Sequence, residues 1–315
     1  MKSGPIRSAD PNRRPGSVRS TSEPRPHAMR AVLFALALLV ALPAQGQRAY
    51  DQASLAAILD RDADLPDRPV QYHRYQIEHE SGNSILARHE LYEILGEGNR
   101  DLGRARLGIA QLLGQPDVTT LRTGQSIVLP DRPRDFDLNP LAYAPYPRTW
   151  AGAAEIDRAV VVDLTTQTWA AYANGGIVRW GPVSTGKAST PTPTGRYFMN
   201  LRALERESSE APPGETWLMR YVMNIYPARG IHLHQYNVVP SGPPEGHGCV
   251  RMVTSDARWL WGWTGGERTT PGTVVIVQGT TPTTTPVRFV DGPDGPERVM
   301  VELPAEPMSV PRGDR

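Results

Sequence analysis

Cysteine is nearly absent from this sequence, because its 315 residues include only Cys249. A single cysteine excludes an internal disulfide framework. Aromatic residues make up only 7% of the chain, whereas 29 glycines and 31 prolines are present. This composition is typical of long loops and unstructured ends around modest cores. The formal net charge of +1 gives no argument for nucleic acid as a partner.

Long apolar runs are also missing. The longest, residues 31–42, is shorter than the roughly 20 residues that a membrane-spanning helix needs. It follows Met29 and Arg30 and precedes the small-residue segment 43–46. A basic flank, a short apolar core and small residues together predict a secretory signal peptide over residues 29–46, with a buried helix as the alternative. We therefore expect an exported protein, in the periplasm or cell wall, with no stable membrane span after cleavage.

Residues 1–28 are rich in arginine, proline and serine and poor in apolar side chains. Such a segment cannot bury enough surface to fold, so we predict a disordered leader. A leader of this length before a signal peptide is unusual. We therefore hypothesise that translation starts at Met29.

Residues 72–131 are predicted to form a small α/β module. Alternation at 75–78 indicates a strand, an apolar stripe at 84–95 indicates a helix, a second helix fits 105–113, and residues 121–130 read as a turn and a closing strand. This β-α-α-β order, and its ending Leu-Arg-Thr-Gly-Gln-Ser-Ile-Val-Leu-Pro, resembles the LysM domain, a glycan-binding module. The alternative is a structural cap without a ligand.

Proline-rich residues 132–156 are predicted to be a linker, and β signals dominate residues 157–279. A short helix is expected near its end, capped by Thr254 or Ser255. The threonine- and proline-rich segment 280–315 is predicted to be a mostly disordered tail. Strands are expected at 160–164, at 168–173, at 177–180 after an Asn-Gly turn, at 196–201, within 217–225 and at 273–277, with the helix at 256–261.

Three tryptophans and one arginine in this region are predicted to have structural rather than functional roles. Trp259, Trp261 and Trp263 are predicted to pack in the core, because such groups are more often core than ligand-binding. Arg179 is predicted to be a solvated charge.

The stretch from residue 230 to residue 252 is the most informative part of the chain, since it contains Cys249 and three of the seven histidines. A neighbouring imidazole turns a thiol into a nucleophile, and the glycines beside Cys249 allow a sharp turn whose amides can stabilise an oxyanion. His232 and His234 alternate with apolar residues on a predicted strand, so both point to one side, and either could be the base. The alternatives are a small buried core cysteine and a zinc set of three histidines and the thiol.

The motif Gly-Ile-His-Leu-His, followed by His-Gly-Cys-Val-Arg-Met, resembles the signature of the L,D-transpeptidase (YkuD-type) family. The Ser-Thr-Gly-Lys and Thr-Pro-Thr-Gly segments upstream resemble the family's loop, and the resemblance covers about residues 157–279. It implies a mainly β fold: a β-sandwich catalytic domain with a short helix, preceded here by the LysM-like module. One departure is Gly246, where the family usually has serine or threonine.

The resemblance implies a role for each matching residue. Cys249 is the nucleophile, His234 is the general base in preference to His232, and the amides around Gly248 and Cys249 are the oxyanion donors. Substrate contacts are expected from His247, Arg251, His232 and Tyr221.

The implied reaction is acyl transfer from a peptidoglycan stem peptide through a thioester to an amine, in cell-wall cross-linking or remodelling. No metal or organic cofactor is required. The expected partners are stem peptides and glycan, with a wall-anchored protein as a further acceptor, and no nucleic acid. Two alternatives stay open: an L,D-carboxypeptidase or endopeptidase with water as acceptor, and a degenerate, non-catalytic wall-binding protein.

Overall fold

The structure is a computed structural model that describes residues 51–265 and 273–313. The chain divides into residues 1–44 and residues 45–315, and the fold concerns the second unit. The predicted leader, signal peptide and start at Met29 lie outside the described residues. Among the described residues, no helix is both long and apolar enough to cross a membrane.

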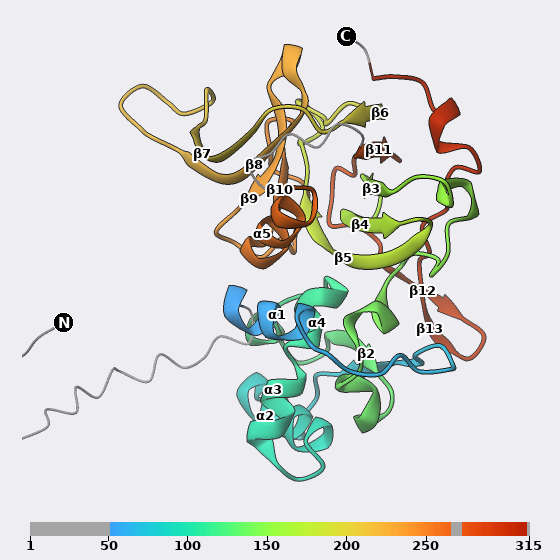
Figure 1. The fold of residues 1–315 in the computed structure, drawn as a ribbon. Coiled ribbons are helices and arrows are strands. Elements are labelled where there is room, and N and C mark those ends of the chain that lie inside the picture. The colour runs from blue at the N-terminus through green and yellow to red at the C-terminus, as the bar shows by residue number, and fades with distance from the viewer. Residues whose placement is uncertain (1–50, 266–272, 314–315) are drawn as a thin grey trace, which may run out of the picture. The chain divides into compact units, whose positions relative to one another are not determined.

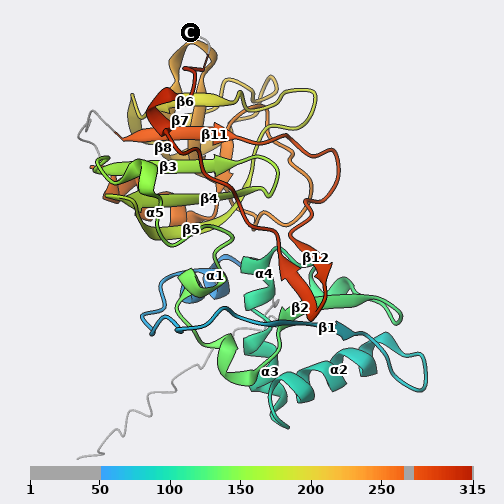
Figure 2. The same cartoon turned by 90° about the vertical axis from the view of Figure 1, so that its right-hand side faces the viewer.

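The dominant element is a curled nine-stranded sheet with the order β6-β11-β3-β4-β5-β10-β9-β8-β7 (Figures 1 and 2). Its two halves join where β5 pairs with β10. The mainly β fold is thus as predicted, and the layers of the expected β-sandwich belong to one continuous sheet. The strands are β3 (Arg158–Asp163), β4 (Thr168–Ala173), β5 (Gly176–Ser184), β6 (Gly195–Phe198), β7 (Arg202–Glu207), β8 (Leu218–Tyr226), β9 (Ile231–Gln235), β10 (Val250–Met252) and β11 (Val274–Gln278).

Both faces of β3 are buried, which explains its unbroken apolar sequence. Val160 and Val162 pack inside the curl, against strands β8 to β10 and the helix α5 (Thr254–Trp263). Ala159 and Val161 face the opposite way, into a second cluster that also contains residues of the N-terminal module. The module and the sheet therefore share a core.

Helix α5 includes the predicted segment 256–261 but begins earlier, at Thr254. The predicted cap at Thr254 or Ser255 is wrong, because the N-cap residue is Val253, whose side chain makes no capping hydrogen bond. The three tryptophans pack as expected. Trp259 stacks on Trp263 at 5.2 Å, and Trp261 meets the ring of Tyr221 at 6.1 Å.

The N-terminal module has helices between two strands, as predicted, but it has three α-helices rather than two, and its first strand begins three residues before the predicted segment 75–78. Its two strands, β1 and β2, form one antiparallel pair, and its helices lie between them in the chain. Helix α2 has the predicted bounds, whereas the second predicted helix is broken near Gly108 into α3 and α4, since glycine weakens a helix. The elements are β1 (Tyr72–Gln76), α2 (Ser84–Leu95), α3 (Arg100–Arg106), α4 (Ile109–Leu113), η1 (Val118–Thr120) and β2 (Ser126–Pro130), preceded by α1 (Gln52–Leu59).

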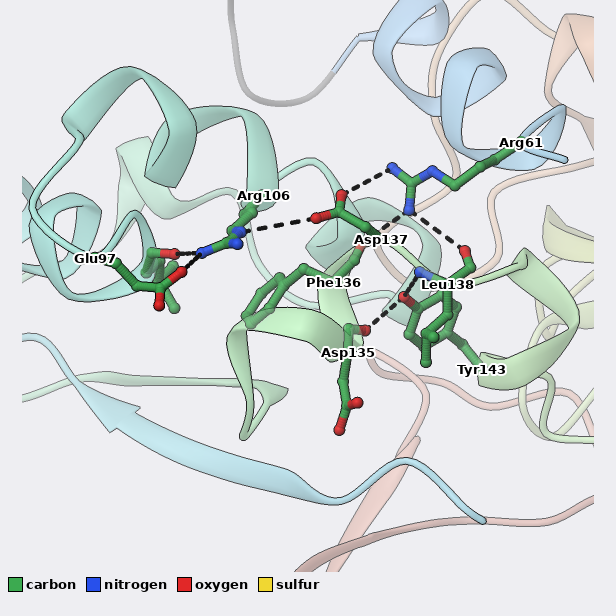
Figure 3. Close-up of polar contacts among 9 residues, drawn as sticks. Arg61, Glu97, Arg106, Asp135, Phe136, Asp137, Leu138 and Tyr143 are labelled. Atoms are coloured by element: carbon green, nitrogen blue, oxygen red, sulfur yellow. Dashed lines mark hydrogen bonds and ion pairs between the residues drawn. The ribbon is translucent and has the colours of Figure 1, made fainter. Parts of the chain in front are cut away.

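The segment predicted as a linker, 132–156, is instead packed into the molecule. It contains the short helices η2 (Pro133–Phe136), η3 (Pro140–Tyr143) and η4 (Ala151–Ala153), and Phe136 and Tyr143 are buried. Arg61 donates to the Phe136 carbonyl at 2.8 Å, and Arg61 and Arg106 both pair with Asp137 (Figure 3). The proline content of this segment suggested a flexible link. Its buried aromatic side chains, and its contacts with Arg61 just after α1 and with Arg106 of α3, hold it in place instead.

The prediction of a mostly disordered tail after residue 280 is also wrong. A hairpin of β12 (Phe289–Gly292) and β13 (Gly295–Arg298), followed by η6 (Pro307–Ser309), packs on the rest of the molecule. The ring of Phe289 meets Tyr72 of β1 at 4.9 Å. Arg288 is buried and donates through Nε to a carbonyl in the β3–β4 turn at 2.9 Å. A few anchoring side chains order this segment although it has few apolar residues.

Arg179 is buried rather than solvated, contrary to prediction. Its Nε donates to Asp256 at 2.7 Å, its Nη2 lies 2.9 Å from Asp60, and its guanidinium lies 5.3 Å from the centre of the Trp259 ring. Asp256 is fully buried, and that burial raises the pKa of its carboxyl to about 6, although Arg179 opposes the shift. Arg179 therefore compensates a carboxylate held inside the core.

We predict that Arg179→Ala lowers the free energy of unfolding by about 3–5 kcal/mol, because it leaves the Asp256 charge buried and unpaired. The matched control is Arg220→Ala, which removes an exposed ion pair with Glu205. That control should cost less than about 1 kcal/mol. Urea unfolding of both variants at neutral pH measures the difference, and equal losses would contradict the assignment.

Candidate active site

The parallel pairing of β9 with β10 brings the predicted nucleophile and base together. Leu233 lies opposite Val250, and both are fully buried in the core inside the curl. Side chains alternate along a strand, so the flanking residues of both segments point to the other face. There they line one cavity of about 610 Å³: His232, His234, Cys249 and Arg251.

The opposite wall of this cavity comes from the segment that connects β7 to β8. Trp217, at the end of that segment, lies 6.4 Å from the ring of His247, measured between ring centres. The cavity therefore has an aromatic rim next to the thiol. Charges of both signs also line it, from Arg206, Glu207, Glu210, Arg229 and Arg251.

His234 is oriented to act as a base. Its Nδ1–H donates to the Gln235 carbonyl at 2.7 Å, which leaves the lone pair on Nε2 available. Burial lowers the pKa of His234 to about 4; the hydrogen bond to Gln235 raises it, and Arg251 and His232 lower it further. The imidazole is therefore neutral near pH 7 and able to accept a proton.

His232 has the opposite arrangement. The Asn224 amide donates one N–H to the Ile231 carbonyl at 3.1 Å and the other to Nδ1 of His232 at 3.0 Å. The reversed amide would put its oxygen against the Ile231 carbonyl oxygen. A neutral His232 thus carries its proton on Nε2 and has no free lone pair there. Burial lowers its pKa to about 4. This geometry favours His234 as the base.

The thiol of Cys249 is partly buried at the head of β10, and its S–H points toward the Gly230 carbonyl at 3.6 Å. Burial raises the pKa of Cys249; the backbone N–H of His232 and the charge of Arg251 lower it, and Glu210 raises it. With His234 neutral as well, the resting pair is thiol and imidazole rather than thiolate and imidazolium.

The turn before Cys249 is held by the loop after β5. Thr192 Oγ1 accepts from the Gly186 amide at 2.9 Å and donates to the Gly248 carbonyl at 2.8 Å. Gly248 has φ +114°, a conformation that favours glycine. Gly246 pairs with Thr185 through its amide at 2.8 Å, and a Cβ there would lie 2.7 Å from the Thr185 carbonyl oxygen. The departure from serine or threonine therefore matches the local backbone.

The remaining predicted site residues divide into two groups. His247 is exposed and Arg251 is half-buried, and both line the cavity; Arg251 also lies over the Tyr236 ring at 4.5 Å. The structure does not bring Tyr221 to the cavity, because its ring packs on Trp261 of α5.

Sequence reasoning missed Asn224 and Gln235, which set the proton positions of the two histidines. Asn224 lies opposite His232 across the β8–β9 pair, which only the strand register reveals. Gln235 acts through its backbone carbonyl, so its side-chain type gives no signal. Within residues 51–265 and 273–313, no three His, Cys, Asp or Glu side chains group in a way that could hold a metal ion.

Comparison with known proteins shows what the β domain resembles. Residues 157–277 match the family model of the YkuD L,D-transpeptidase catalytic domain. The chain resembles solved structures of L,D-transpeptidase 1 from Mycobacterium tuberculosis (21% identity, TM-score 0.32) and an L,D-transpeptidase from Mycobacterium smegmatis (19%, 0.32). Each comparison covers 39% of this chain and, respectively, 62% and 58% of the other, so this chain spans less than two thirds of their length. No curated protein matches the chain.

The neutral resting pair of Cys249 and His234 predicts how Cys249 reacts with iodoacetamide. Because its pKa lies above the ordinary thiol value of about 8.5, the alkylation rate at pH 7 should be a small fraction of its maximum. The rate should still be rising near pH 9. The alkylation rate is measured by quenching the reaction at set times and recording the intact mass at each pH, with a peptide that contains a free cysteine as the control. A plateau between about pH 5 and pH 8 would instead indicate a thiolate–imidazolium pair.

The contacts of Gly246 predict that Gly246→Ser is harmful, although serine is usual there in the family. Its Cβ would force the Thr185 backbone to move, at a cost of about 1–3 kcal/mol. Gly242→Ser is the matched control, because a Cβ at Gly242 meets no atom within 4 Å. Thermal unfolding and the alkylation rate of Cys249 should change in the first variant only. A stable, fully reactive Gly246→Ser protein would show that this backbone position tolerates a side chain.

Proposed function

We propose that this protein is an L,D-transpeptidase that transfers an acyl group from a peptidoglycan stem peptide through Cys249. The observation that carries the proposal is the state of His234, which shares a cavity with Cys249 and points its protonated nitrogen at the Gln235 carbonyl. The other ring nitrogen is then free to take the thiol proton. The YkuD match of the domain supports the same chemistry.

In the first half-reaction, Cys249 Sγ attacks the carbonyl carbon of the L,D-peptide bond while its proton passes to Nε2 of His234. In this proposal the backbone N–H groups of Gly248 and Cys249 stabilise the oxyanion, and the positive φ of Gly248, which turns this segment sharply, supports that role. The C–N bond then breaks, the proton moves from His234 to the leaving amine, and the terminal D-residue departs. Cys249 is left as a thioester.

In the second half-reaction, an amine from a neighbouring stem attacks the thioester. His234 takes a proton from the amine, the C–S bond breaks, and the sulfur recovers that proton. A new amide links the two stems. Water in place of the amine would give hydrolysis by the same steps.

The cavity suits a peptide that carries charges of both signs. Its volume of about 610 Å³ lies within the usual range for small-molecule sites, about 300–1,000 Å³. The positive charges of Arg229 and Arg251 and the negative charges of Glu207 and Glu210 line the same cavity as the thiol. Free carboxylates and amines of stem peptides complement these groups.

We further propose that the module at residues 72–131 is a LysM-like glycan-binding domain and that the protein acts after export, in the periplasm or cell wall. The module's element order and its Gly-Gln-x-Ile-x-Leu-Pro ending support the first point. Asn83 caps helix α2 by accepting hydrogen bonds from the amides of Ile85 and Leu86. These bonds give the turn at residues 82–85, Gly-Asn-Ser-Ile, a defined shape. The segment at residues 29–46 supports export.

We predict that a synthetic stem tetrapeptide, supplied without an amine acceptor, forms a covalent adduct on the wild-type protein. The mass of the protein should increase by the mass of the tetrapeptide minus that of the released free D-amino acid. Cys249→Ala should form none, and His234→Ala should acylate roughly 10²–10⁴-fold more slowly because it lacks the base. Intact-mass spectrometry over time measures both, and circular dichroism checks that the variants fold.

Three results would revise the proposal in different ways. Unchanged turnover in Cys249→Ala would remove this residue as the nucleophile. An adduct that decays rapidly without an amine would indicate a carboxypeptidase. Retained glycan binding by a wild-type protein that never forms an adduct would indicate a non-catalytic wall-binding protein.

A further inference from the structure

Helix α1 lies about 100 residues before the matched YkuD domain, yet it contacts the back of the active site. Gln52, the first residue of α1, donates through Nε2 to the Tyr236 carbonyl at 3.0 Å and accepts at Oε1 from the Thr254 amide at 2.8 Å. One side-chain amide thus bridges the exit of β9 and the start of α5.

The hydrogen bond from Thr254 gives its backbone N–H an acceptor that helix α5 itself does not supply. The first amides of a helix have no partner within it, and Val253, the N-cap residue of α5, offers no side-chain acceptor. Gln52 supplies that acceptor from a distant part of the sequence. This contact accounts for stability but not for any effect on chemistry.

The bond to Tyr236 bears directly on the base. The peptide between Gln235 and Tyr236 holds His234 through its carbonyl, and its N–H donates to the Met252 carbonyl at 2.8 Å. Gln52 fixes the next carbonyl along the chain, that of Tyr236. With the groups on both sides of Tyr236 bound, the Gln235 carbonyl has little freedom to rotate away from Nδ1 of His234.

Helix α1 is itself firmly held, so Gln52 has a rigid support. Asp51 caps its start by accepting from the Ser54 amide at 2.7 Å, and Leu55 is fully buried. At the other end, Arg179 joins Asp60 to Asp256 of α5. Both ends of α1 are therefore tied to the same helix, α5.

We infer that Gln52 is a positioning residue for His234: it fixes the backbone carbonyl that sets the orientation and proton position of the base. The inference rests on the proposed function for its kinetic consequences. It also makes α1 a working part of the catalytic unit, although α1 lies outside the residues that match the family.

The test separates the two bonds of Gln52. Gln52→Glu keeps an oxygen acceptor for Thr254 but cannot donate to the Tyr236 carbonyl at neutral pH, whereas Gln52→Ala loses both bonds. Gln76→Ala is the control, an exposed glutamine of β1 far along the chain from the site. Each protein is measured for thermal unfolding, for the rate constant and KM of acylation by the stem tetrapeptide, and for the titration of His234 by NMR.

If the inference holds, Gln52→Glu unfolds near the wild-type temperature but acylates roughly 10- to 100-fold more slowly, with KM little changed, because a small displacement of a catalytic group is costly. In Gln52→Ala, which adds no charge, the pKa of His234 should fall, since the Gln235 hydrogen bond favours its charged form. Gln52→Ala should show the same kinetic loss and also be less stable. Gln76→Ala should match the wild type.

Wild-type acylation by Gln52→Glu, together with an unshifted His234 titration in Gln52→Ala, would overturn the inference and leave Gln52 as a cap for α5. Failure of the proposed function looks different. In that case the wild type forms no acyl adduct, while the NMR titration still reports whether Gln52 holds the environment of His234.

Discussion

The site depends above all on two short strands, β9 and β10, that run parallel with a fixed register. Because Val250 lies opposite Leu233 and both enter the core, the residues beside them must face the same cavity. A slip of one residue would turn the base into the core and the apolar side chains into the cavity. The burial of Leu233 and Val250 therefore keeps Cys249 and His234 on one face.

The surroundings of this pair consist of backbone carbonyls fixed by hydrogen bonds from distant segments. Thr192 binds the Gly248 carbonyl next to the proposed nucleophile, and Gln235 supplies the carbonyl that orients the proposed base. Backbone groups move less than long side chains, so they hold a catalytic geometry without losing side-chain entropy. Thr192 of the Thr-Pro-Thr-Gly loop and Gln52 of helix α1 each donate a hydrogen bond to a backbone carbonyl beside the site.

The sequence predicted this arrangement in part. Local signals located most strands of the large sheet, though not β7 and β10, as well as helix α2 and the Asn-Gly hairpin. The motif around Cys249 located the thiol and its histidines. Arg179, Asn224 and Gln52 could not be predicted in the same way. The partner of Asn224 lies across a strand pair, that of Arg179 is 77 residues away, and those of Gln52 are 184 and 202 residues away. The order of residues 132–156 and of the tail was missed for a related reason: composition describes a segment's own apolar content but not the surface that receives it.

The raised pKa of Cys249 has a consequence for durability. Oxidants attack a thiolate far faster than a thiol, and the oxidised forms beyond sulfenic acid are not recovered. The chain has no second cysteine that could trap a sulfenic acid as an internal disulfide. Because burial favours the protonated sulfur, an exported protein of this kind would lose its only thiol to oxidants more slowly than it would lose a permanently ionised cysteine.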